Sequence, residues 1–106
     1  MRPLAGLYTV GVVRNVVLIK LKPDTTPTQV ERLVADVRAI PFGGLVSMTI
    51  GRDAGLRDGN ADLAIVADFE DEDSYRRYDS DEVHNRVRRE LLVPIVDRVE
   101  RCQIRL

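Results

Sequence analysis

The sequence is poor in the residues that build metal centres and disulfide frameworks. Among its 106 residues, Cys102 is the single cysteine and His84 the single histidine. One cysteine forms no intrachain disulfide, and one cysteine with one histidine falls short of the four ligands of a structural zinc site. We therefore predict no metal site and no cofactor. We interpret Cys102 as a small hydrophobic residue buried in the core.

An excess of charge of one sign is also missing. The chain carries 16 basic and 17 acidic side chains, with a formal net charge of -1. This balance provides no general field that would attract nucleic acid or an anionic membrane. The apolar run at residues 4–13 is shorter than the roughly 20 residues that span a bilayer, and no signal-peptide cleavage pattern follows it. We expect no nucleic-acid or membrane partner and, by default, a cytoplasmic location.

What is present supports one domain. Apolar residues make up 44% of the sequence, and a chain of this length builds a single core of modest size. No repeat or linker interrupts it. The first strand-like segment begins at Arg14, so we divide the chain into an N-terminal extension (1–13) and one domain (14–106).

The first half of the domain predicts a strand, a helix and a second strand. Residues 14–22 are rich in β-branched side chains and predict a strand covered on both faces. Thr26 as N-cap, Pro27 at the first helical position and Gln29 form a capping box at the start of a helix. The following apolar stripe runs to residue 40, as expected of an amphipathic helix.

The second half predicts two more strands and a helical region between them. Alternation over 45–51 predicts a strand with Val46, Met48 and Ile50 on one face, and residues 62–69 and 96–106 predict two further strands. We expect Asp71 to cap a short helix that ends at Tyr78. A longer helix, capped by Asp79 or Ser80, is predicted to run to residue 93 and to place Leu91 on the same face as His84.

The order β-α-β-β-α-β predicts an α+β, ferredoxin-like fold: a four-stranded antiparallel sheet with both helices on one face. The other sheet face is then bare, and four apolar residues are expected on it: Val16, Leu18, Ala64 and Val66. A bare apolar face of this size calls for a partner. Homodimerisation through the sheet is the simplest solution.

Three segments, read in order, resemble a known family. They are RNVVLIKLKPDTTPTQV, LVSMTIGRDAGL followed by DLAIVADFEDEDSYRRY, and HNRVRRELLVPIVDRVERCQI. Their order and spacing are similar to the stress-responsive A/B barrel (Dabb) domain over residues 14–104. The resemblance implies a homodimeric α+β barrel. The family includes proteins of no established activity, plant stress proteins, a hydroxynitrile lyase and olivetolic acid cyclase, which closes a polyketide chain by aldol condensation.

The same resemblance points to catalytic residues. His84 and Tyr78 match the histidine and the tyrosine of olivetolic acid cyclase, as general base and as hydrogen-bond donor to an enolate oxygen. The chain departs from the pattern at three places: Asp81-Glu82 replaces a His-Pro pair, and Asn15 and Leu63 stand where other members have histidines. The alternative interpretation is that His84 is a locally hydrogen-bonded histidine on a helix face.

We expect any ligand to bind between the helices and the sheet. The candidate ligand-binding residues are Asn15, Val17, Ile19, Leu33, Val37, Leu63 and Ile65. Three functions remain open: a non-catalytic dimer that binds a small hydrophobic or aromatic ligand, a cofactor-free cyclase or lyase acting on a polyketide-like or β-dicarbonyl substrate, and an oligomeric structural stress protein. Haem binding would have His84 as its axial ligand, but nothing else in the sequence suggests a haem pocket.

Overall fold

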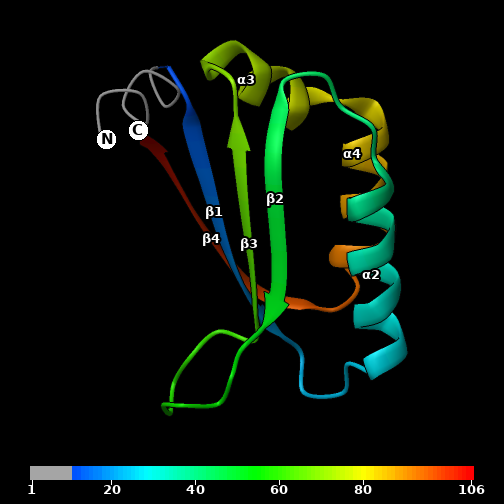
Figure 1. The fold of residues 1–106 in the computed structure, drawn as a ribbon. Helices are drawn as coiled ribbons and strands as arrows, with labels where there is room; N and C mark the ends of the chain where they lie inside the picture. Colours follow the sequence, from blue (N-terminus) through cyan, green and yellow to red (C-terminus); the bar gives the residue numbers. More distant parts are fainter. Residues whose placement is uncertain (1–10) are drawn as a thin grey trace.

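The computed structural model describes residues 11–106 and shows a four-stranded antiparallel sheet with helices on one face (Figure 1). The strand order is β2-β3-β1-β4, which together with the helices confirms the predicted ferredoxin-like α+β fold. The strands are β1 (Val13–Leu21), β2 (Leu45–Arg52), β3 (Leu63–Phe69) and β4 (Val96–Arg105). The helices are α2 (Pro27–Ala39), α3 (Glu72–Ser80), α4 (Glu82–Val87) and a π-helical turn, η1 (Arg88–Leu92).

The structure bears on the predicted N-terminal extension and on the expected absence of a membrane-spanning helix. Most of the predicted N-terminal extension, residues 1–10, lies outside the described part of the chain, and Val13 is already the first residue of β1. Within residues 11–106, no helix is long and apolar enough to cross a membrane. The cytoplasmic location stays a prediction.

Helix α2 forms as its sequence predicts. The Thr26 hydroxyl accepts a hydrogen bond from the Gln29 backbone at 3.2 Å, and the Gln29 side chain accepts one from the Thr26 backbone at 2.8 Å, which completes the capping box. Val30, Leu33 and Val37 on the inner face are buried against the sheet. This face forms one wall of the core.

The helical region after β3 differs from the prediction in two ways. Helix α3 continues to Ser80, whose hydroxyl donates to the Arg76 carbonyl at 2.9 Å in the last turn. The cap of α4 is Asp81 rather than Asp79 or Ser80, because the Asp81 carboxylate accepts a hydrogen bond from the His84 amide. Helix α4 then widens into η1, where the Val93 amide donates to the Arg88 carbonyl at 2.9 Å. The additional residue in this turn buries Leu92 in the core, while Leu91, predicted on the face of His84, packs against the core and is only partly buried.

A bulge in β2 corrects the prediction for Val46. The pairing with β3 shifts between Leu45 and Ser47, so Val46 is an extra residue that turns outward and is 59% exposed. Met48 and Ile50 beyond the bulge pack against the core as expected.

Within residues 11–106, no element covers the face of the sheet opposite the helices. Val16, Leu18, Ala64 and Val66 are all at least partly exposed there, as predicted. Cys102 pairs with Val16 and therefore shares this face, where it is exposed. The prediction of a buried Cys102 is wrong for the single chain, because the helices cover only the other face.

The connection from α2 to β2 depends on Gly44. Gly44 has φ +93°, and a Cβ atom at this position would lie 2.7 Å from the Cβ of Ser74, which is buried in α3. We expect Gly44→Ala to lower the free energy of unfolding by about 2–5 kcal/mol, from left-handed backbone strain plus overpacking. Gly59→Ala is the matched control, because φ is +82° there and a Cβ atom would meet no other atom within 4 Å. Urea denaturation of both variants checks this, and equal losses would contradict the steric part of the argument.

Candidate active site

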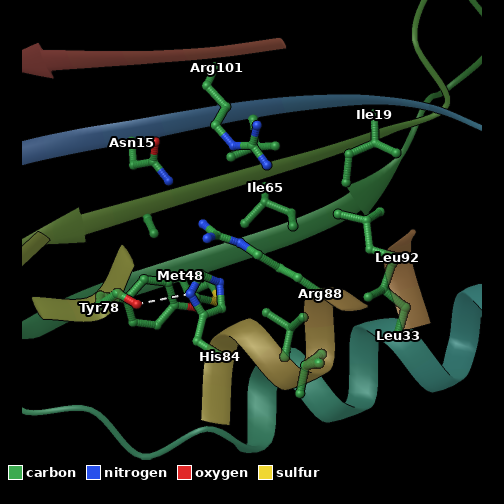
Figure 2. Close-up of a pocket in the computed structure, with 14 residues that line it drawn as sticks. Asn15, Ile19, Leu33, Met48, Ile65, Tyr78, His84, Arg88, Leu92 and Arg101 are labelled. Carbon is green, nitrogen blue, oxygen red and sulfur yellow. Dashed lines mark hydrogen bonds between the residues drawn. The ribbon is translucent and has the colours of Figure 1, made fainter. Parts of the chain in front are cut away.

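A cavity lies between the helical layer and the sheet (Figure 2). Its walls are mostly apolar, and its polar lining groups belong to Asn15, Tyr78, His84, Arg88 and Arg101. The volume in which the centre of a water molecule fits is about 40 Å³. Since one water needs roughly 10–15 Å³ by this measure, the cavity has room for a few waters or a very small ligand. A ring-sized ligand enters only if the surrounding side chains move outward.

Eight of the nine residues that we singled out from the sequence meet at this cavity. They are Tyr78 and His84 with six of the predicted ligand-binding residues, namely Asn15, Val17, Ile19, Leu33, Val37 and Ile65. Leu63 does not line it. It is the first residue of β3, paired with Ile19 and Arg52, and is buried in the core on the far side of Ile65.

His84 is held in one orientation by two hydrogen bonds. Its backbone amide donates to the Asp81 carboxylate at 3.0 Å, and its Nδ1 lies 2.9 Å from the Tyr78 carbonyl oxygen (Figure 2). Because a carbonyl only accepts hydrogen bonds, Nδ1 carries the proton and Nε2 has a free lone pair in the neutral ring. Nε2 has no hydrogen-bond partner within residues 11–106. Every fully buried side-chain nitrogen in this range does have a partner. Nε2 is therefore not fully buried and borders open space.

The surroundings of His84 favour its neutral form. Burial lowers the pKa of the imidazole below its usual value, and the nearby Arg88 guanidinium lowers it further. The Tyr78 carbonyl, Asp79 and Asp81 oppose this shift with smaller effects. His84 is therefore a neutral acceptor near pH 7, as a general base must be.

The Tyr78 side chain lies against the histidine and stays protonated. The two ring centroids are 4.0 Å apart, and the Tyr78 ring also contacts Phe42 and Phe69 at 5.2 and 5.1 Å. Burial raises the pKa of Tyr78 to about 12. The phenol is a hydrogen-bond donor at neutral pH and not a base.

The cavity is also lined by three nitrogen donors. Asn15 is buried, and its side-chain oxygen accepts a hydrogen bond from Gln103 at 2.9 Å. This leaves the Asn15 amide nitrogen facing the cavity (Figure 2). The guanidinium groups of Arg88 and Arg101 are the other two donors, from η1 and β4. Sequence reasoning named neither arginine as a site residue. For Arg101 the reason is that the cross-strand register that places it beside Val17 is not visible in the sequence.

Comparison with known proteins identifies the family. The Stress responsive A/B Barrel Domain (Dabb) matches residues 13–102, which is most of the chain. The chain belongs to this family. A search of curated proteins gave no match.

Solved structures with the Dabb fold are similar over nearly the whole chain. A dimeric ferredoxin-like protein of unknown function from Thermobifida fusca has 29% identity and a TM-score of 0.81, with 93% of this chain and 94% of that chain covered. A Dabb family protein from Mesorhizobium loti has 21% identity and a TM-score of 0.74, covering 89% and 95%. The hydroxynitrile lyase of Passiflora edulis has 16% identity and a TM-score of 0.77, covering 90% and 93%. The last two show the fold alone.

The departures from the Dabb enzyme pattern have structural roles in this chain. Asp81, in the place of a histidine, is the N-cap that orients the first turn of α4 and with it His84. Asn15, in the place of another, supplies an amide to the cavity. Within residues 11–106, no three His, Cys, Asp or Glu side chains are grouped as metal ligands. The residues at this cavity can transfer a proton and donate or accept hydrogen bonds.

Proposed function

We propose that this Dabb protein binds a small, partly apolar or aromatic ligand in the cavity between its helices and its sheet. One observation carries the proposal: His84 is fixed with its free Nε2 at the border of a cavity whose other walls are mostly apolar. Apolar walls with a few fixed polar groups are typical of small-molecule sites.

The experiment that tests ligand binding is an NMR titration of the single histidine. In the free protein we expect the His84 ring to titrate with a midpoint below the usual 6.5, because the buried site disfavours the imidazolium. Small aromatic and β-dicarbonyl compounds should shift both the ring resonances and this midpoint. A ring that titrates like a free imidazole and responds to none of the compounds would reject the proposal.

We also propose that the protein is a homodimer joined through the bare sheet face. The support is an apolar surface on the strands, formed by Val16, Leu18, Ala64, Val66, Cys102 and Ile104. An apolar surface of this kind on one side of a sheet is usually covered by a partner. The similar Thermobifida fusca protein is described as dimeric.

A second candidate function is cofactor-free enolisation of a carbonyl substrate, as in a cyclase or lyase. The observation that favours it is the pairing of a neutral histidine acceptor with a protonated tyrosine at one cavity. His84 Nε2 would take a proton from the carbon next to a carbonyl. The electron pair of that C–H bond would form a C=C bond to the carbonyl carbon, and the π electron pair of the carbonyl would move onto its oxygen. Tyr78 would donate a hydrogen bond to the resulting enolate oxygen. The imidazolium would then return its proton to the product.

A further inference from the structure

The polar lining of the cavity is unevenly charged. Arg88 and Arg101 both line it, and none of its lining residues is an aspartate or a glutamate. A largely apolar cavity therefore carries two cations and, among its lining residues within 11–106, no anionic side chain.

The two arginines differ in how far their charges are neutralised. Arg88 forms an ion pair with Asp79 at 2.8 Å and donates to the Asn85 side chain at 2.9 Å, so its position is fixed and part of its charge is balanced. Arg101 forms no ion pair or side-chain hydrogen bond with any other residue of the range 11–106. It pairs with Val17 in the sheet, and its side chain therefore points to the same face as Val17, toward the cavity.

The Asn15 side chain, on the strand next to Arg101, is also a donor. With its oxygen occupied by Gln103, the Asn15 side chain presents only N–H to the cavity. The Arg101 guanidinium adds several N–H groups in a planar fork, which suits the two oxygens of a carboxylate. The acceptor of the cavity, His84 Nε2, comes from α4 in the helical layer, whereas Asn15 and Arg101 come from β1 and β4.

We propose that the ligand of this cavity carries a carboxylate, which binds Arg101 and the Asn15 amide, while its apolar part lies toward His84 and Tyr78. This inference rests on the proposed ligand-binding function and adds the chemical class of the ligand. Arg88 contributes to the field that attracts the anion and stays bound to Asp79. If the site is catalytic, the carboxylate places the rest of the substrate near the base.

The test is a comparison of benzoate with benzamide, which has nearly the same shape and no charge. We expect the wild-type protein to bind benzoate about tenfold more tightly than benzamide, a preference typical of a charge-assisted hydrogen bond. Arg101→Gln should remove the preference, because it should lower the affinity for benzoate and leave the affinity for benzamide unchanged. Arg105→Gln is the matched control: it removes a cation from the same strand and face, outside the cavity, and should keep the preference. Affinities come from the shifts of the His84 ring and of each compound.

The outcomes separate the inference from the function on which it rests. If wild-type protein binds both compounds equally well, or if Arg101→Gln keeps the preference for benzoate, the carboxylate inference is wrong and the binding function stands. If neither compound binds, the carboxylate inference is overturned, and the binding function is decided by the titration with the other aromatic and β-dicarbonyl compounds. Loss of the preference in Arg105→Gln as well would show that net charge, not the position of Arg101, attracts the anion, and would also overturn the inference.

Discussion

Leu18→Asp is expected to disrupt the proposed dimer and to leave the protein monomeric at micromolar concentration. Leu18 lies in the bare face and is 43% exposed in the single chain, so the substitution costs the isolated subunit little. In the proposed dimer, two unpaired carboxylates would be buried, one from each subunit, at a cost of several kcal/mol. Each would also lie beside Glu100, the cross-strand partner of residue 18. We expect the dissociation constant to rise about 10³-fold or more.

Size-exclusion chromatography with light scattering, over a range of concentrations, measures this effect. The control is Leu56→Asp, which makes the same chemical change at a residue that is 89% exposed in the β2–β3 connection. It should leave the dimer intact. A Leu18→Asp protein that remains dimeric at every concentration would place the interface on another surface.

The parts of the fold that could be predicted from the sequence are those set by local chemistry. The capping box at Thr26 and Gln29 satisfies backbone groups within one turn, so its residues alone indicate where α2 begins. The alternation in β3, with Leu63, Ala67 and Phe69 buried, needs only the two-residue period of a strand. Such signals do not depend on what the segment later packs against.

The errors arise where a neighbouring element decides the conformation. Val46 turns outward because β2 and β3 pair with a bulge, which depends on both strands. Cys102 is exposed because it lies on the sheet face that the helices do not cover, and which face they cover is decided by the whole fold. Neither fact could be found from the segment itself.

In the candidate site, too, some features could be predicted from the local sequence and others depend on neighbouring elements. Resemblance to the Dabb family indicated His84 and Tyr78, but not that the carbonyl of one residue sets the tautomer of the other. The charged residues of β4 read as a solvent-exposed pattern, and Arg101 becomes a cavity residue only through its pairing with Val17. To predict a site built from several strands and helices, the register of all of these elements must be known.

The π-helical turn links the fold to the site. Arg88 begins η1 and Leu92 ends it, and both line the cavity together with His84 and Val87 of the preceding helix. With regular α-helical spacing, Leu91 would follow Val87 on the inner face. The wider turn presents Leu92 instead, and π-bulges of this kind are frequent at functional sites. The distortion is consistent with a helix shaped for its cavity.

If the enolisation candidate is correct, His84→Gln will lower the rate of α-proton exchange by about 10²-fold or more. The substrate for this test is benzoylacetone in D₂O, an aromatic β-dicarbonyl whose exchange above the uncatalysed rate is measured by NMR. Glutamine can still donate a hydrogen bond to the Tyr78 carbonyl, so the fold of this turn is kept while the basic nitrogen is lost. Because burial lowers the pKa of His84, the wild-type rate should already be at its plateau at pH 7 and fall only in acid.

The tyrosines provide a matched pair of variants for the same reaction. Tyr78→Phe removes the phenol that would donate to the enolate oxygen and should lower the exchange rate by about 10-fold or more. Tyr75→Phe removes a phenol that does not line the cavity, and should leave the rate unchanged. If the wild-type protein does not raise the exchange rate above the uncatalysed rate, the enolisation candidate is rejected and ligand binding remains the proposed function of this cavity. Exchange that survives His84→Gln would assign the base to another residue.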